Sequence, residues 1–279
     1  MPRIERHRTS RVSNSSAWLN GHAHNVRSQV GEDGILEKIF EVIGTENRWC
    51  VEFGAWDGEY LSNTWHPINN LGWSGVLIEG NSEKFEDLKR TYPEGHAKTH
   101  LMNRFVGWEG EEALDTILAE TPIPHDFDLL SIDIDGNDYH VWNALNAYRP
   151  RVIISEFNPT IPNDIIFVQD PVPDLMQGCS LAALIELGKQ KGYELVCAAP
   201  WNGIFVRSDL YPQFGIADNS IDAMHHCEWD MTIFHGYDGT FFGAGHMYVN
   251  WHAIPLTHED LQMIPARMRV FPDAPTRVK

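Results

Sequence analysis

The sequence predicts an α/β protein in which a mainly parallel sheet is covered by helices on both faces. Apolar runs alternate with amphipathic segments from about residue 49 to residue 157, and this alternation is typical of parallel sheets. The runs 129–132 and 152–154 are almost continuously apolar, as in strands that are buried on both sides. Asn202-Gly203 then lies between two further apolar runs and is a hairpin signal. We therefore expect seven strands, of which the last two form an antiparallel hairpin.

The expected elements follow one another regularly. A helix containing Ile35, Leu36 and Ile39, with Gly44 at its end, precedes the first strand. The sequence predicts strands near 49–53, 75–79, 97–102, 127–133, 151–157, 193–199 and 203–207. It predicts the other helices near 62–70, 82–91, 110–119, 139–146 and 180–191.

Two flanking regions lack this alternation. Residues 1–28 form an N-terminal arm with five arginines and no periodic apolar face, so we expect it to be mobile or pinned by a neighbouring subunit. Residues 29–209 form the core domain. Residues 210–279 are rich in aromatic residues, Gly and His without a regular pattern. We expect an irregular C-terminal extension that acts as a lid or as an oligomer contact.

The composition limits the partners of this 279-residue chain. It has 21 Lys and Arg residues and 39 Asp and Glu residues. The resulting net charge of −18 repels nucleic acid and anionic membranes. The sequence has no apolar stretch of the ~20 residues that a membrane span needs, and no secretory signal, so we expect a cytoplasmic protein. A small-molecule substrate fits best, and homo-oligomer formation is left open.

The four cysteines form no C-x-x-C pair. They are Cys50, Cys179, Cys197 and Cys227. We expect them to be reduced and mostly buried.

The first predicted strand ends in a glycine loop, Glu52-Phe53-Gly54-Ala55-Trp56-Asp57-Gly58. Glycines in such a strand–turn–helix segment let a ligand approach the main chain closely. The spacing is not the G-x-G-x-x-G of dinucleotide-binding proteins, and an ordinary turn is the simpler alternative. Glu79 ends the next strand, 27 positions after Glu52. A carboxylate at that position accepts hydrogen bonds from ribose hydroxyls in nucleotide-binding α/β folds.

Further carboxylates follow the fourth and fifth strands. Asp133 and Asp135 have the same side-chain direction if the fourth strand persists, and Glu156 and Asn158 end the neighbouring strand. An all-oxygen group of this kind suits a hard cation, with Mg²⁺ the best choice and Mn²⁺ the next. A calcium loop of the EF-hand type does not fit the spacing from Asp133. For Asp138 we expect an N-cap role at the following helix.

Together, the segments 51–58, 75–81, 131–138 and 202–206 resemble FkbM-type S-adenosylmethionine-dependent methyltransferases of class I. The resemblance covers about residues 29–207. It implies a Rossmann-like fold, S-adenosylmethionine as the cofactor, and O-methylation of a sugar or another small metabolite. In related metal-dependent enzymes, acidic residues after the fourth and fifth strands bind Mg²⁺, although those enzymes have paired aspartates where this chain has Glu156-Phe157-Asn158.

The resemblance assigns roles residue by residue. The methionine end of the cofactor would lie against the glycine loop, the ribose at Glu79, and the adenine near 103–105. The implied cofactor-binding residues are Glu52, Gly54, Ala55, Gly58, Glu79, Asn81, Asn103 and Asp133. The implied catalytic residues are Asp135 and Asp133. The implied metal ligands are Asp135, Glu156 and Asn158.

Two other functions stay open at this point. One is a non-catalytic module of the same fold that binds the cofactor or a nucleotide. The other is a nicotinamide oxidoreductase, which the missing G-x-G-x-x-G disfavours. In the extension, His225, His226, His235 and His246 offer a base or a zinc site, but their spacing favours scattered packing and surface histidines.

Overall fold

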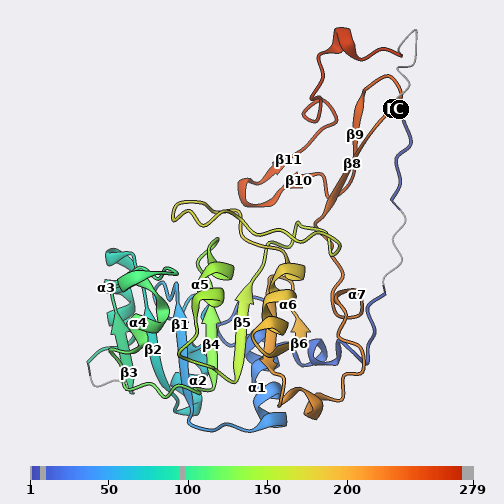
Figure 1. Ribbon diagram of the computed structural model, residues 1–279. Helices are drawn as coiled ribbons and strands as arrows, with labels where there is room; N and C mark the ends of the chain where they lie inside the picture. The colour runs from blue at the N-terminus through green and yellow to red at the C-terminus, as the bar shows by residue number, and fades with distance from the viewer. Residues whose placement is uncertain (1, 7–10, 95–97, 272–279) are drawn as a thin grey trace.

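The computed structural model describes residues 2–6, 11–94 and 98–271. Its centre is a seven-stranded sheet with the strand order β3-β2-β1-β4-β5-β7-β6 (Figure 1). The strands are β1 Trp49–Phe53, β2 Ser74–Ile78, β3 Thr99–Met102, β4 Leu129–Ile132, β5 Val152–Glu156, β6 Tyr193–Ala198 and β7 Asn202–Arg207. The pairs from β3 to β5 are parallel, whereas β7 runs antiparallel to both of its neighbours. This confirms the predicted Rossmann-like α/β fold and its terminal hairpin.

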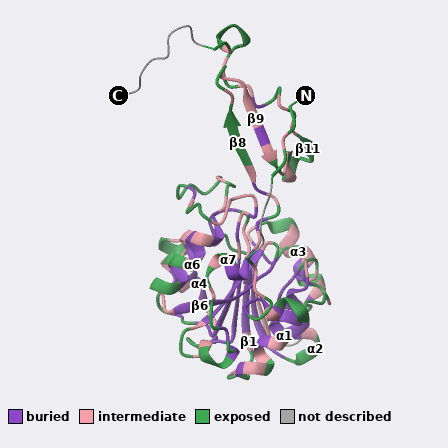
Figure 2. Ribbon diagram, turned by 90° about the vertical axis from the view of Figure 1, so that its right-hand side faces the viewer, coloured by how far each residue is buried: buried purple, intermediate pink, exposed green. Residues whose placement is uncertain are grey.

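Helices cover both faces of the sheet. Figure 2 shows α4 and α6 on one side and α1, α2 and α3 on the other. The main helices are α1 Glu32–Ile43, α2 Trp65–Leu71, α3 Ser82–Thr91, α4 Leu114–Leu118, α5 Asp138–Ala144 and α6 Leu181–Gln190. The expected helix near 110–119 is divided into the 3₁₀ turn η2 Gly110–Glu112 and the short helix α4, because Ala113 between them has an extended backbone.

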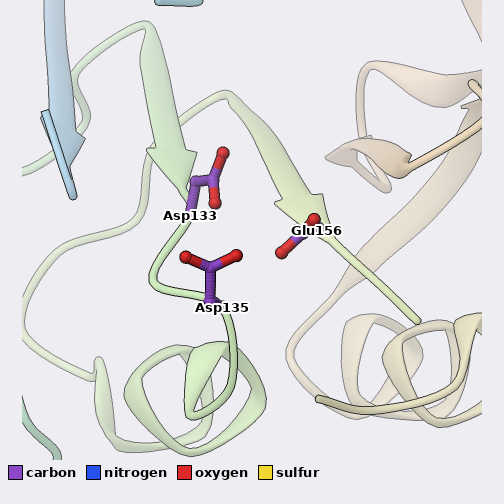
Figure 3. Close-up of side chains that lie close together, drawn as sticks. All are labelled: Asp133, Asp135 and Glu156. Carbon is purple, nitrogen blue, oxygen red and sulfur yellow. The ribbon is translucent and has the colours of Figure 1, made fainter. Parts of the chain in front are cut away.

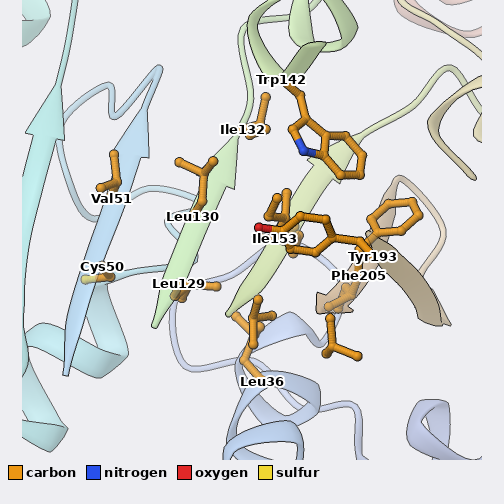
Figure 4. Close-up of a cluster of buried hydrophobic side chains, with 14 of the residues drawn as sticks. Leu36, Cys50, Val51, Leu129, Leu130, Ile132, Trp142, Ile153, Tyr193 and Phe205 are labelled. Carbon is orange, nitrogen blue, oxygen red and sulfur yellow. The ribbon is translucent and has the colours of Figure 1, made fainter. Parts of the chain in front are cut away.

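The hydrophobic core lies between the sheet and these helices. The central strands β2 and β4 are buried at every position. Trp142 of α5 packs against Phe205 of β7 at a ring-centroid distance of 5.0 Å and edge-on against Tyr193 of β6 (Figure 4). The four cysteines are buried and form no disulfide bond, as predicted. Such continuous burial on both faces explains why these strands read as unbroken apolar runs.

The described residues of the N-terminal region contact their own chain, whereas the sequence led us to expect a mobile arm or one pinned by a neighbouring subunit. Leu19 of η1 Trp18–His22 is completely buried in the core. Asn20 donates to the backbone oxygen of Ala198, and Trp18 donates to that of Phe214. Nearer the start, Arg6 forms an ion pair of 2.7 Å with Asp230. Contacts of such large sequence separation leave no local pattern in the sequence.

The C-terminal extension has a later start and more structure than expected. Phe214 of η3 Tyr211–Phe214, Ile216 and Met224 of α7 Ile221–Met224 belong to the main core. Beyond them, β8 Met231–His235 and β9 Phe241–Gly245 form an antiparallel hairpin, and β10 Tyr248–Val249 pairs with β11 Ile254–Pro255. The 3₁₀ turn η4 Asn250–His252 lies between β10 and β11, and the 3₁₀ turn η5 Ala266–Met268 follows them.

The hairpin projects away from the core, beside the N-terminal residues (Figures 1 and 2). Its base lies over the carboxyl ends of the parallel strands. In the described part of the chain, no helix has the length and apolar character that crossing a membrane requires.

Candidate functional site

A cavity of about 1010 Å³ opens at the carboxyl ends of β1, β2, β4 and β5. This is the edge at which α/β sheets bind ligands. The glycine loop after β1 and the residues 79–81 after β2 form one end of the cavity. Asp133, Asp135 and Glu156 form the other, and residues 104–109 and 173–176 close its sides. The order of the strands thus brings two predicted sets of site residues into one cavity: those that follow β1 and β2, and those that follow β4 and β5. More than 50 residues separate the two sets in the sequence.

The acidic group consists of Asp133, Asp135 and Glu156 (Figure 3). One carboxylate oxygen of each residue lies within 4.8 Å of the other two. Burial raises the pKa of Asp133 well above its ordinary value, and repulsion from Asp138 and Asp135 adds to this effect. Burial, with repulsion from the same aspartates and Asp133, raises the pKa of Glu156 to about 10. Three carboxylates at this distance are stable together only with protons or with a cation between them.

The residues of this group converge for a reason other than strand alternation. β4 ends at Ile132, and Asp135 has a positive φ of 58°, so the strand does not persist to Asp135 as the sequence analysis assumed. This left-handed residue turns the chain after β4, and the carboxylates of Asp133, Asp135 and Glu156 lie close together at the ends of β4 and β5 (Figure 3). Left-handed backbone costs energy in a residue with a Cβ and is enriched at functional sites.

Asp138 stabilises the turn that carries the two aspartates. Its Oδ1 accepts a hydrogen bond of 3.1 Å from the Ile134 amide, and its Oδ2 accepts one of 2.9 Å from the Gly136 amide. Asn137 occupies the N-cap position of α5. The expectation that Asp138 is the N-cap is therefore wrong, because its carboxylate binds the preceding turn instead.

Glu52 lines the cavity but is largely used for structure. Its Oε2 accepts hydrogen bonds from the hydroxyls of Ser62 (2.6 Å) and Thr64 (2.8 Å), and its Oε1 accepts one from the Asn63 amide (2.8 Å). These bonds fix the segment that leads to α2. Burial raises the pKa of this carboxyl, and the hydrogen bonds oppose that rise.

The two glycines of the loop face the protein, not the ligand space. Both have positive φ, 73° for Gly54 and 75° for Gly58. A Cβ on Gly54 would lie 1.8 Å from the backbone oxygen of Asp133, and a Cβ on Gly58 would meet Leu88 and Tyr92. Gly54 borders the cavity, whereas Gly58 does not. The structure therefore does not bring Gly58 into the site. A glycine is needed at position 58 because the chain packs closely against α3 there.

Glu79 lies at the opposite end of the cavity from the acidic group. Its Oε2 accepts a hydrogen bond of 2.8 Å from the Trp56 amide, and its Oε1 accepts one of 2.6 Å from the Asn81 amide. Ala55 and Asn81 border the same space, and Asn81 also caps α3. Each oxygen of Glu79 keeps one lone pair for a ligand, since a carboxylate oxygen has two.

Asn103 and Asn158 lie outside the cavity. The Asn103 amide donates to the backbone oxygen of Glu79 at 2.7 Å, so this side chain supports the site from behind. Asn158 Oδ1 accepts hydrogen bonds from the amide and hydroxyl of Thr160, and its Nδ2 donates to Gln177. These bonds keep Asn158 out of the carboxylate group in which the sequence analysis placed it.

The histidines of the extension do not converge on one another in the described chain. His225 is buried against Phe157 and shares a hydrogen bond of 2.8 Å with Asn163, whereas His246 bonds Asn250. Among the His, Cys, Asp and Glu side chains of the described residues, the acidic group is the one set of three or more whose ligand atoms are close enough to hold a metal ion. These contacts fit the interpretation of the histidines as packing residues.

Aromatic residues that the sequence analysis did not assign border the cavity. Trp201 lies in the turn between β6 and β7 and stacks on Trp229 at 5.0 Å, while Trp251 of η4 packs edge-on against Trp201 at 5.8 Å. Trp201 and Trp251 line the cavity. Only the aromatic composition of the extension signals them, because their meeting depends on how the extension folds over the sheet.

The cavity is strongly acidic. Eight carboxylates and one arginine line it. They are Glu52, Glu79, Glu109, Glu112, Asp133, Asp135, Glu156 and Asp174, with Arg104. Arg104 is itself paired with Glu120, 3.0 Å away. A cationic ligand is favoured in such a field.

Comparisons with known proteins add similarity in fold. No family model and no curated protein matches this sequence. The structure is similar to M. capricolum TrmK in complex with S-adenosyl-homocysteine, with 11% identity, a TM-score of 0.38, and coverage of 62% of this chain and 67% of that one.

Two other solved structures are similar to the same degree. The citrinin polyketide synthase CMeT domain has 12% identity and a TM-score of 0.40, and the match covers 63% of this chain and only 51% of that one. The O-methyltransferase from Bacillus cereus has 19% identity and a TM-score of 0.41, with 69% and 84% covered. Because these scores are low, the function proposed below rests on the geometry of this chain.

Proposed function

We propose that this protein is an S-adenosylmethionine-dependent methyltransferase that methylates a hydroxyl group of a small molecule, with Mg²⁺ bound at the acidic group. One observation carries the proposal. A single cavity at the carboxyl edge of the sheet joins the strand-end carboxylate of Glu79 to Asp133, Asp135 and Glu156. This arrangement provides a place for a nucleoside at one end and for proton chemistry at the other.

The nucleoside end is built by Glu79 and its neighbours. The Trp56 and Asn81 amides orient the carboxylate, whose remaining lone pairs suit the two hydroxyls of a ribose. The ring of Phe105 lies beside Gly80 and borders the cavity, next to Glu79. A flat aromatic side chain at this place suits a purine base.

The charge of the cavity favours a sulfonium cofactor over a dinucleotide. The carboxylates of the cavity wall, among them Glu79, Asp135 and Asp174, repel a pyrophosphate and attract a cation. In addition, α2 begins only at Trp65, well beyond the glycine loop, so no helix N-terminus follows the loop directly to bind phosphate. Bound S-adenosylmethionine supplies an electrophilic methyl group.

The acidic group supplies the proton acceptor. Asp135 is the most exposed of its three members and is accessible to a hydroxyl that enters the cavity. Its carboxylate would take the proton that the acceptor oxygen loses as that oxygen is methylated.

The same residues fit a divalent cation. Three carboxylates lie within ligand distance of one another, and among the described residues no Lys or Arg forms an ion pair with them. Asp133, Asp135 and Glu156 would hold Mg²⁺, which when bound lowers the pKa of a coordinated hydroxyl.

Calorimetric titration tests the cofactor. S-adenosylmethionine and its demethylated product should bind the purified protein, and NAD should not. Glu79→Gln should weaken binding about tenfold or more, because hydrogen bonds to a charged group are worth about 1.5–3 kcal/mol. Glu83→Gln, on the exposed first turn of α3, is the matched control. Tighter binding of NAD, or unchanged affinity in a folded Glu79→Gln protein, would contradict the proposal.

Thermal unfolding tests the cation without any substrate. Added Mg²⁺ should raise the melting temperature of the wild-type protein, since a ligand of the folded state stabilises it. The shift should disappear in Asp135→Asn and in Glu156→Gln. It should persist in Asp174→Asn, which removes a carboxylate that lines the cavity outside the acidic group. If Mg²⁺ and Mn²⁺ leave the wild-type protein unchanged, Asp135 acts as a direct general base.

A further inference from the structure

A second cavity, of about 890 Å³, adjoins the first at the acidic group. The two cavities share Asp135, Glu156, Met176 and Trp251 in their walls. The second one extends away from Glu79, beneath the loop of residues 157–178 that follows β5. The acidic group therefore lies at the boundary of two spaces, each large enough for a small organic molecule.

The walls of the second cavity are mainly apolar. Its apolar lining residues include Ile161, Pro162, Ile165, Phe167 and Met176. Ile165 is 45% exposed and Met176 is 75% exposed, so apolar side chains face the solvent-filled space. Burying exposed apolar surface stabilises a complex by about 25 cal/mol per Å². A ligand with apolar surface would gain this free energy here.

The polar groups of the cavity exclude anions. Asp135, Asp138 and Glu156 lie at its inner end, and no Lys or Arg of the described chain lines it. His252 is the single side chain there that is able to carry a positive charge. A phosphate or carboxylate on the ligand would meet the carboxylate of Asp135 and would find no Lys or Arg in the described wall to pair with.

We infer that the second cavity is the acceptor site and that it takes a largely apolar molecule without an anionic group, whose hydroxyl points at the acidic group. The inference rests on the proposed function for the identity of the reaction, but the ligand class follows from the cavity itself. When no cation is bound at the acidic group, the cavity wall disfavours phosphorylated sugars, nucleotide sugars and carboxylic acids as ligands. The donor and acceptor would then approach the acidic group from opposite sides.

The C-terminal extension completes this site. Trp251 lies in the wall of both cavities, is 56% exposed, and contacts Trp201 through an edge-on packing of their rings. Its neighbour His252 lines the second cavity only. Residues of η4 thus form part of the acceptor wall, which gives the extension a role in substrate selection.

Three probes of equal chain length test the ligand class: octan-1-ol, octanoate and octylammonium. Ligand-observed NMR in EDTA measures their affinities, so that no metal ion bridges the carboxylate probe to the protein. Octan-1-ol should bind, and octanoate should bind at least tenfold more weakly. Octylammonium should bind at least as well as the alcohol, because its charge complements the acidic group.

Two variants locate the binding. Ile165→Asp should weaken octan-1-ol at least tenfold, and Ile165→Asn, which adds no charge, should weaken it severalfold. Leu71→Asp is the matched control, because Leu71 is 41% exposed and lies at the end of α2, just before the amino end of β2. It should bind the probe like the wild type. The affinity for S-adenosylmethionine, measured in parallel, should be the same in all of these proteins and shows that each is folded.

The outcomes separate the two proposals. Equal affinities for octan-1-ol and octanoate, or no effect of both Ile165 substitutions, would overturn the acceptor-site inference even if S-adenosylmethionine binds. If S-adenosylmethionine fails to bind but the alcohol shows the expected selectivity and sensitivity to Ile165, the methyltransferase proposal fails and the ligand site stands.

Discussion

Gly54 lies where the end of β1 touches the chain that leaves β4. Its backbone has a φ of 73°, and the backbone oxygen of Asp133 occupies the place of a Cβ, at 1.8 Å. A side chain at this position would therefore displace Asp133, which belongs to the acidic group. The requirement for glycine here comes from the protein and not from space left for a ligand.

Gly54→Ala should therefore lower the free energy of unfolding more than the same substitution at a glycine that has a positive φ but no close neighbours. Gly72→Ala is the matched control, because Gly72 has a φ of 71° and no neighbouring atom lies within 4 Å of the position that a Cβ would occupy. The control should lose about 1–2 kcal/mol of its free energy of unfolding, because alanine is unfavourable in the left-handed backbone conformation. Gly54→Ala should lose about 1–3 kcal/mol more through overpacking. Urea unfolding measures both, and equal losses would show that the Asp133 backbone yields freely.

His225 makes the folding free energy depend on pH. Burial, assisted by repulsion from His226, lowers the pKa of His225 to about 4, from an ordinary value near 6.5. Between these values the unfolded chain binds a proton that the folded chain does not. The contribution of neutral His225 to the free energy of unfolding should therefore be complete above about pH 6.5. It should decrease as the pH drops toward 4, by up to roughly 3 kcal/mol.

Unfolding curves at several pH values test this prediction when the wild type is compared with two histidine variants. His225→Gln should unfold with a smaller loss of stability between pH 6.5 and 4 than the wild type. His235→Gln, a substitution on the exposed strand β8, should keep the wild-type loss. A wild-type slope in His225→Gln would assign the acid sensitivity to other groups.

At the scale of elements, the amino edge of the sheet is held by a buried ion pair. Arg151 Nη1 donates to Asp128 Oδ1 at 2.6 Å, and both side chains are almost completely buried. Asp128 also accepts hydrogen bonds from the amides of residues 46–48, and Arg151 donates to the backbone oxygens of Ile43 and Gly44. The pair therefore joins α1, β1, β4 and β5 at the edge opposite the cavity.

Asp128→Asn should destabilise the protein by about 3–5 kcal/mol, because it removes the buried counter-charge of Arg151 and leaves it the exposed carboxylate of Glu46, 3.8 Å away. The exposed pair of Arg207 and Asp209, 2.7 Å apart, provides the control. Asp209→Asn should cost at most about 1 kcal/mol. Denaturant unfolding compares the two variants. Similar losses for both would mean that the buried pair contributes no more than a surface one.

At the scale of the whole molecule, the projecting hairpin has features of an assembly surface. Ile233 and Phe234 of β8 are 39% and 43% exposed, and β8 pairs only with β9 within the described chain. A two-stranded hairpin with an apolar surface is marginally stable alone. The sequence leaves homo-oligomer formation open, and we propose that this hairpin forms a contact between two copies of the chain.

Light scattering after size-exclusion chromatography tests the assembly. The wild-type protein should have the mass of a dimer or a larger oligomer at micromolar concentration, since burial of exposed apolar surface stabilises association. The double substitution Ile233→Asp and Phe234→Asp should yield the mass of a single 31.8 kDa chain. Leu71→Asp should leave the mass unchanged. A monomeric wild-type protein would contradict the prediction.

Periodicity by itself determined the sheet of this protein and the strand ends that meet at its carboxyl edge. Unbroken apolar runs locate buried strands, and the parallel arrangement brings the residues that follow them to one edge. For this reason Glu79, Asp133, Asp135 and Glu156 could be predicted as neighbours of one cavity, and the structure places all four in its wall.

Only the tertiary structure decided what the side chains between the strands do. The left-handed backbone of Asp135 directs the acidic group, while Gly58, Asn103, Asp138 and Asn158 are used by neighbouring turns and helices. The second cavity and the ion pair of Arg6 with Asp230 join segments that are far apart in the sequence. Local patterns record which face of a strand or helix is buried, but a turn's direction and a distant contact depend on the packing of the whole chain.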